Sequence, residues 1–94
     1  MTMHKQHKID CHTHIVNSEI STQYFNTPGG GDFAMVMEFL PYMQKENMPD
    51  HSWDLCEGND RLFLCPSIDI HQNIPEQLTT IEKKMLQRPL CRVV

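Results

Sequence analysis

Residues 9–15 read Ile-Asp-Cys-His-Thr-His-Ile, an apolar run that carries two histidines separated by one residue. In a β-strand alternate side chains point to the same face, so His12 and His14 share a face and Cys11 takes the other. Cα atoms at this spacing are roughly 6.5 Å apart, and both rings can reach one ion at about 2.0–2.1 Å from each nitrogen. The spacing therefore predicts half of a metal site on a strand.

Some residues support this prediction, and the number of histidines offers an alternative to it. Asp10 has the same parity as the pair, so it is placed to accept a hydrogen bond from an imidazole. His71 follows a later apolar run and is either a catalytic or substrate-contacting residue or a solvated loop residue. The chain has six histidines, so a chance pair on a solvated surface is the alternative to a metal site.

The segment 8–15, Lys-Ile-Asp-Cys-His-Thr-His-Ile, resembles the first barrel strand of the amidohydrolase superfamily. The resemblance is to the amidohydrolase-related group that includes aminocarboxymuconate-semialdehyde decarboxylase, and residues 61–70 with the following helix resemble an early strand and helix of it less specifically. The resemblance implies a (β/α)₈ TIM barrel in which His12 and His14 bind a catalytic divalent metal, with Zn²⁺ as the first choice. It also implies a small-molecule substrate, a carboxylic acid, attacked by metal-activated water or polarised by the metal.

Length limits what this chain can hold, because such a barrel typically takes about 250 residues and the chain has 94. We therefore expect residues 1–94 to be a single partial domain that contains strand 1, helix 1, strand 2, helix 2 and the start of the next strand. Residues 89–94 read as that new strand, or as the last strand of a small α/β domain. The other metal ligands and the catalytic base would then lie outside this chain, and we expect the chain alone to be inactive.

The first half of the chain predicts one long loop and one helix. Residues 16–32 are polar and include the glycines 29–31, which predicts a first βα loop over the barrel mouth, either a flexible linker or a substrate-covering segment. Residues 32–47 predict helix 1, because Phe33, Val36 and Leu40 recur at helical spacing, with a break near Pro41.

The second half of the chain predicts one strand and one helix. Residues 48–60 read as a loop, or hide a degraded strand in 52–56. Residues 62–65 are a continuous apolar block, typical of a buried parallel strand. Asn73 and Glu76 resemble a capping box ahead of a helix that Pro89 ends.

Composition excludes some classes of partner and location. The net charge is −4 and the pI is about 5.8, so we expect no nucleic-acid partner. We expect no membrane association and a cytoplasmic location, because the chain lacks a run of 18 apolar residues and a signal peptide. The four cysteines lack Cys-x-x-Cys spacing and read as buried thiols. A homodimer of the full-length protein stays open.

Two other functions compete with a hydrolase or decarboxylase. A TatD-like nuclease or phosphoesterase barrel also begins with a histidine pair but acts on phosphate esters. A non-catalytic small α/β domain with incidental histidines is the alternative outside enzymes. Metal content separates the enzyme from the binding domain, and the substrate class separates the two barrels.

Overall fold

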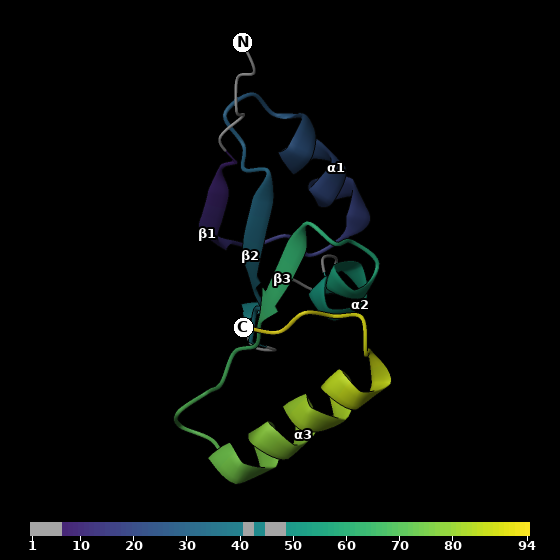
Figure 1. Ribbon diagram of the computed structural model, residues 1–94. Helices are drawn as coiled ribbons and strands as arrows, with labels where there is room; N and C mark the ends of the chain where they lie inside the picture. The colour runs from purple at the N-terminus through teal and green to yellow at the C-terminus, as the bar shows by residue number, and fades with distance from the viewer. Residues whose placement is uncertain (1–6, 41–42, 45–48) are drawn as a thin grey trace.

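The computed structural model describes residues 7–40, 43–44 and 49–94, and in these ranges strands and helices alternate (Figure 1). The described strands are β1 (Ile9–Thr13), β2 (Phe33–Met37) and β3 (Leu62–Cys65). The described helices are α1 (Ser18–Asn26), α2 (Ser52–Glu57) and α3 (Ile74–Gln87). This alternation confirms the α/β class that the sequence predicts.

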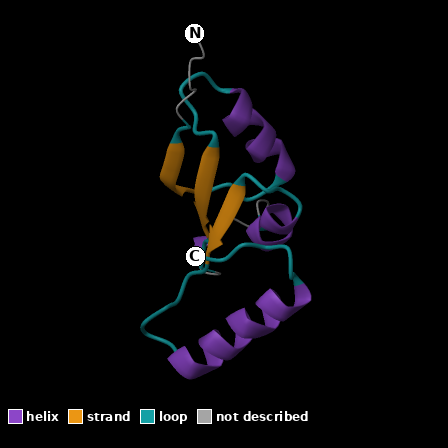
Figure 2. Cartoon of the chain, viewed as in Figure 1, coloured by secondary structure: helices purple, strands orange, loops and turns teal. Residues whose placement is uncertain are grey.

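The described strands form one parallel sheet in the order β1-β2-β3, with a helix in each connection (Figure 2). The helices α1 and α2 pack on the same face of this sheet. That face is formed by four side chains with 0% exposure: Ala34, Val36, Leu62 and Leu64. Ile15, Trp53 and Cys56 complete this core from the first loop and from α2. We call this side of the sheet the covered face.

The other side of the sheet carries the alternate residues of each strand, and we call it the open face. The strand register places Phe33 beside Ile9, Met35 beside Phe63, and Met37 beside Cys65. Apart from Ile9, which is 62% exposed, these side chains are half-buried rather than buried. Parallel sheets normally have both faces covered, so the open face is unusual for this kind of sheet.

The prediction of a helix over residues 32–47 is wrong for its first part, because Phe33–Met37 is the central strand β2. Residues 41–42 and 45–48, including the break expected at Pro41, lie outside the described residues. The apolar run Phe-Ala-Met-Val-Met has no polar side to present to water, and its position between two strands buries Ala34 and Val36 completely. Apolar residues 3 and 4 positions apart also occur by chance in such a continuous apolar run, so the pattern indicated a helix where the chain forms a strand.

Two segments expected as loops contain helices. In α1, the Asn17 side chain accepts a hydrogen bond from the Ile20 amide at 2.9 Å, which caps the helix, and Ile20, Tyr24 and Phe25 pack against the core. In α2, the buried residues Trp53 and Cys56 face the sheet, so the alternative of a degraded strand in 52–56 is also wrong. Consequently Leu62–Cys65 is a confirmed strand but the third in order, not the second.

The end of the described chain agrees with the sequence pattern. Asn73 caps α3 by accepting a hydrogen bond from the Glu76 amide at 3.1 Å, and the helix ends at Gln87. Beyond it, Val93 pairs with Leu64 in a parallel bridge. The Leu64 amide donates to the Arg92 carbonyl at 2.8 Å, and the Val94 amide donates to the Leu64 carbonyl at 2.9 Å. Residues 92–94 therefore pair with β3 through one isolated parallel bridge, which fits both expectations for residues 89–94.

Helix α3 lies beyond the ends to which the strands point, rather than on a face of the sheet (Figures 1 and 2). It contains no buried residue, and Ile81 is its partly buried contact with the core. Its other apolar residues are largely exposed: Ile74, Leu78, Met85 and Leu86. The expected apolar stripe is thus present on α3, but Ile74, Leu78 and Met85 in it are 39–50% exposed in the described structure.

Candidate functional site

The histidine pair lies at the carboxyl edge of the sheet, where β1 ends. The ring centroids of His12 and His14 are 5.3 Å apart and the ring planes meet at 81°. Both side chains are exposed. Two imidazoles bound to one tetrahedral ion at about 2.0–2.1 Å have centroids roughly 5 Å apart. The structure therefore brings the two predicted residues together at a separation that suits a shared metal ion.

A β-bulge lies in β1 between Asp10 and Thr13 and includes His12. Asp10 pairs with Ala34 and Thr13 with Val36, so three steps along β1 match two steps along β2. The extra residue breaks the regular alternation that the sequence analysis assumed for this strand. Bulges often occur beside functional sites because they change the direction of a side chain. His12 lies in this bulged segment of β1 and is exposed.

Asp10 is held by partners other than an imidazole. One of its carboxylate oxygens accepts a hydrogen bond from the His12 backbone amide at 3.0 Å. The other accepts one from the Tyr24 hydroxyl at 2.9 Å, and that hydroxyl accepts one from the Gly31 amide at 3.0 Å. Asp10 thus stabilises the backbone of the bulge, which replaces the expected contact with a histidine ring.

The environment of Tyr24 keeps its hydroxyl protonated. Burial makes the largest contribution in raising the pKa of Tyr24, the Gly31 amide opposes it, and the hydrogen bond and charge of Asp10 raise the pKa further. A phenol with a raised pKa remains a hydrogen-bond donor throughout the neutral range. Tyr24 therefore donates to Asp10 throughout the neutral pH range.

The His14 ring is fixed from two sides. Its Nδ1 atom lies 2.9 Å from the Met37 carbonyl oxygen, and its ring stacks on Phe39 with centroids 4.1 Å apart and planes at 13°. A carbonyl oxygen only accepts, so Nδ1 donates in this contact, and a ring protonated on Nδ1 alone has its lone pair on Nε2. A hydrogen bond of this kind behind a histidine is the usual arrangement for metal ligands.

Phe39 is itself anchored, and sequence analysis missed its role because it assigned the residue to a helix. The Phe39 amide donates to the Asp50 carboxylate at 2.7 Å, and the other oxygen of that carboxylate accepts from the Ser52 amide at 2.8 Å. The signal that could have found Phe39 is its position directly after the apolar run of β2. Loops at the carboxyl ends of parallel strands converge on one edge of the sheet.

Other residues singled out from the sequence lie away from the pair or do not join it. The His71 amide donates to Asp69, and the exposed His71 belongs to the long loop between β3 and α3. Gly31 lies near the Asp10 amide at the amino-terminal edge of the sheet. The expectation that the glycines 29–31 lie over the carboxyl edge of the strands is therefore wrong. Within the described ranges, no three His, Cys, Asp or Glu side chains form a group that could hold a metal ion.

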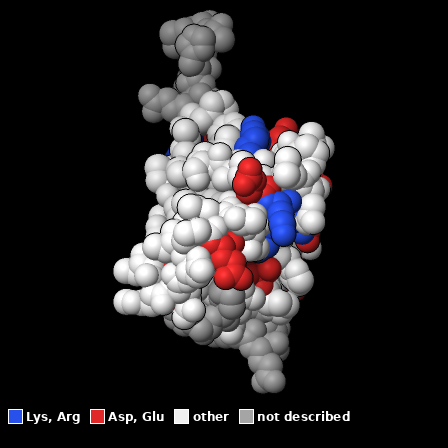
Figure 3. Space-filling model, turned by 90° about the horizontal axis from the view of Figure 1, so that it is seen from below, with Lys and Arg blue, Asp and Glu red and all other residues white. Residues whose placement is uncertain are grey.

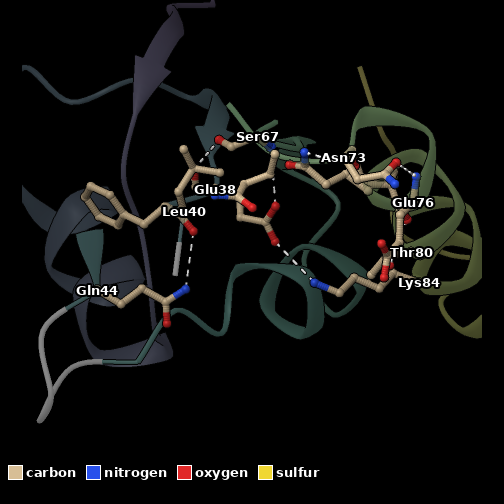
Figure 4. A pocket seen from close by; sticks show the side chains of 12 residues that line it. Glu38, Leu40, Gln44, Ser67, Asn73, Glu76, Thr80 and Lys84 are labelled. Carbon is tan, nitrogen blue, oxygen red and sulfur yellow. Dashed lines mark hydrogen bonds and ion pairs between the residues drawn. The ribbon is translucent and has the colours of Figure 1, made fainter. Parts of the chain in front are cut away.

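Glu38 follows β2 and contacts residues of both following helices, and Figure 4 shows its ion pair with Lys84. Its carboxylate accepts from the Trp53 indole at 2.5 Å and from the Ser67 amide at 3.3 Å, and it lies 3.6 Å from the Lys84 ammonium. The Ser67 hydroxyl donates to the Glu38 carbonyl. Glu38 had not been singled out from the sequence.

A cavity of about 380 Å³ lies between this cluster and α3. Most of the residues that line it are polar, among them Gln44, Ser67, Glu76 and Lys84 (Figure 4). Phe39 lines the cavity and also stacks on His14, whereas neither histidine of the pair lines it. The cavity is therefore adjacent to the candidate metal site but separate from it.

The cysteines divide into two kinds. Cys56 and Cys91 are buried in the core, and burial, with smaller contributions from nearby acidic groups, raises the pKa of Cys56 to about 12. Burial is also the main cause that raises the pKa of Cys91. Cys65 is half-buried and Cys11 is exposed, so the expectation of buried thiols is wrong for Cys11. A thiol with a raised pKa is a poor nucleophile, which leaves Cys56 a packing role.

Charges on the end of the molecule that carries α3 are mixed (Figure 3). Acidic and basic groups lie side by side there, and the view contains no broad basic patch. Among the described residues, no helix combines the length and apolar character required to cross a bilayer.

Comparison with known proteins adds no neighbour. The chain matches no family model, no curated protein and no solved structure. The resemblance of residues 8–15 to the amidohydrolases therefore rests on that sequence motif alone.

Proposed function

We propose that this chain forms the opening part of a (β/α)₈ barrel of the amidohydrolase-related type, in which His12 and His14 bind a divalent metal, with Zn²⁺ as the first choice. The full-length enzyme would be a metal-dependent hydrolase or decarboxylase that acts on a carboxylic acid. The observation that carries the proposal is the Nδ1 contact of His14 with the Met37 carbonyl. It leaves Nε2 of His14 available for a metal, 5.3 Å ring to ring from His12.

The arrangement of the sheet supports a barrel. Its strands are parallel, follow chain order and carry α1 and α2 on a single face, as the opening units of a (β/α)₈ barrel do. The open face carries Phe33, Met35, Met37 and Phe63, bulky apolar residues of the kind that fill a barrel interior. Enzymes with this fold place their active sites at the carboxyl edge of the strands, which is the edge that carries the histidine pair.

The chemistry of the donor set fits a catalytic metal in part. Catalytic zinc usually has three protein ligands and one open position, and two imidazoles supply two of the three. When bound, a metal ion of this class polarises a carboxylate or carbonyl and lowers the pKa of water. His12 and His14 would hold the ion, the Met37 carbonyl would orient His14, and Phe39 would shield one side of that ring from water.

Zinc binding by this chain tests the proposal directly. We expect isothermal titration to detect one Zn²⁺ per chain, and the double substitution His12→Ala, His14→Ala to abolish that binding. His71→Ala is the matched control, since it removes an exposed histidine outside the pair and is expected to leave zinc binding unchanged. Absence of binding to the unsubstituted chain would favour a non-catalytic α/β domain.

Substrate class distinguishes the two barrel enzymes. If the full-length protein retains zinc, it should be assayed against an aromatic or muconate-type carboxylic acid and against a phosphodiester. Turnover of the carboxylic acid supports the amidohydrolase-related assignment. Turnover of the phosphodiester alone would replace that assignment with a TatD-like phosphoesterase.

A further inference from the structure

Tyr24 is connected to the candidate metal site through two successive hydrogen bonds. Its hydroxyl lies 2.9 Å from one oxygen of the Asp10 carboxylate, and the other oxygen lies 3.0 Å from the His12 backbone nitrogen. Tyr24 belongs to α1 and Asp10 belongs to β1, so this connection joins a helix of the covered side to the strand that carries the pair. The Asp10 side chain, held by Tyr24, therefore fixes the backbone amide of His12.

The glycine before β2 is what allows this connection. A Cβ atom on Gly31 would lie 2.7 Å from the Tyr24 hydroxyl and 2.8 Å from the Phe33 carbonyl oxygen, closer than carbon and oxygen atoms can approach. With no side chain, the Gly31 amide instead donates to the Tyr24 hydroxyl at 3.0 Å. The hydroxyl is thus held between one donor and one acceptor, which leaves it a single orientation.

The bulge explains why this backbone contact affects the direction of a ring. Between the residue pairs Asp10–Ala34 and Thr13–Val36 the strand β1 contains one extra residue, so the β1–β2 ladder does not fix Cys11 and His12 as it fixes its regular pairs. The hydrogen bond from the His12 amide to Asp10 is the contact that replaces the ladder at this point. His14, by comparison, has its own ring contacts with Met37 and Phe39.

We propose that Tyr24 is a positioning residue for His12: its hydroxyl holds Asp10, Asp10 holds the bulged backbone, and the bulge places the His12 ring beside that of His14. The inference rests on the proposed function, since positioning matters for a pair that binds one metal ion. It assigns a role to the phenol on α1 and to Gly31, neither of which contacts the ion. Removal of a contact behind a metal ligand typically costs about 10-fold or more in metal affinity.

Tyr24→Phe in the 94-residue chain tests this inference, with two measurements. The first is the NMR cross-peak between the ring protons of His12 and His14 in the metal-free protein, and the second is the Zn²⁺ dissociation constant. We expect the substitution to weaken the cross-peak strongly and to raise the dissociation constant about 10-fold. Ser21→Ala is the matched control, because it removes a buried hydroxyl from the same helix, three residues earlier.

The outcomes separate the inference from the proposed function. If Tyr24→Phe retains both the cross-peak and the zinc affinity, the positioning role is wrong and the metal site survives. If the unsubstituted chain binds no zinc, the proposed function fails, and the cross-peak alone still decides whether Tyr24 positions the ring. Equal losses in Ser21→Ala and Tyr24→Phe would show a general effect of α1 and would overturn the inference.

Asp10→Asn provides a second variant if Tyr24→Phe does not fold. Asparagine keeps one side-chain oxygen, so it can accept from the Tyr24 hydroxyl or from the His12 amide but has lost the second carboxylate oxygen. We expect a smaller loss of the cross-peak and of zinc affinity than in Tyr24→Phe. An unchanged cross-peak in Asp10→Asn would contradict the proposed connection.

Discussion

The two faces of the sheet differ although the same strands form both. On the covered face, Val36 and Leu64 are fully buried beneath α1 and α2, whereas on the open face their neighbours Met35 and Phe63 are half-buried. An Arg92 guanidinium lies 4.3 Å from the centre of the Phe63 ring, which gives this residue one contact from the end of the chain. This difference shows that α1 and α2 cover one face of the sheet, whereas a parallel sheet normally has both faces covered.

The largest expected effect compares neighbouring strand residues on opposite faces. Leu64→Ala creates a cavity in the covered core and should lower the free energy of unfolding by about 2–5 kcal/mol. Phe63→Ala removes a larger side chain, but one that is half-buried, and should cost about 1–2 kcal/mol. Urea denaturation of both variants measures the difference. A loss for Phe63→Ala that equals or exceeds that for Leu64→Ala would show that the open face is covered in solution.

A second comparison concerns Gly31, where an added Cβ atom would clash, and Gly58, where it would fit. Gly31→Ala places a Cβ atom against the Tyr24 hydroxyl and the Phe33 carbonyl, and should cost about 1–3 kcal/mol by forcing α1 away from the sheet. Gly58→Ala should instead stabilise by about 0.4–1 kcal/mol, since its φ is −87° and its nearest contacts are 3.7 and 3.8 Å. Thermal unfolding of the two variants should therefore shift in opposite directions. A stabilising Gly31→Ala would contradict the close approach.

The thiol of Cys56, which is buried in the core of the covered face, should make the free energy of unfolding depend on pH. Cys56 has its pKa raised from 9.0 to about 12, so the folded state keeps a proton that the unfolded chain releases above pH 9. Its contribution to stability is complete below pH 9 and falls as the pH rises, by about 1 kcal/mol at pH 10. Chemical denaturation at pH 8 and pH 10 measures this loss, with Cys56→Ala as the variant whose pH dependence should be smaller.

Alkylation provides a site-resolved form of the same comparison. Iodoacetamide at pH 8 should modify Cys11 first, then Cys65, which lies on the open face, and should leave Cys56 and Cys91 unmodified in the folded protein. Peptide mass spectrometry reads each site separately. Modification of Cys56 at the rate of Cys65 would mean that the covered core opens as readily as the open face.

The smallest expected effect lies at the edge of the sheet. Ile9 is 62% exposed and shares the open face with Phe33. Ile9→Thr keeps a β-branched side chain and should change the free energy of unfolding by less than about 0.5 kcal/mol. A loss above 1 kcal/mol by denaturant titration would indicate that something packs on Ile9 in solution.

Local signals in the sequence were sufficient for some elements. The run 62–65 and the capped, apolar-striped helix 74–87 occur where their patterns predicted them, because each carries its own boundary residues, such as Asn73 and Pro89. The residues 33–37 and 18–26 were assigned to the wrong elements. The first is a strand only because β1 and β3 flank it, and the second is a helix stabilised by packing on the core. Burial on both sides overrides helical spacing in such short apolar runs.

The candidate site also has one part that follows from the local sequence and one that depends on the tertiary structure. The sequence by itself determined that His12 and His14 lie close together, since two imidazoles at alternate positions need only a short extended backbone to approach each other. Tertiary structure alone decided which groups stand behind them: the Met37 carbonyl at the end of β2, the Phe39 ring, and the Asp10–Tyr24 contact. Those groups come from residues up to 25 positions away along the chain. Contacts at such separations depend on strand register and on the bulge, which no local pattern encodes.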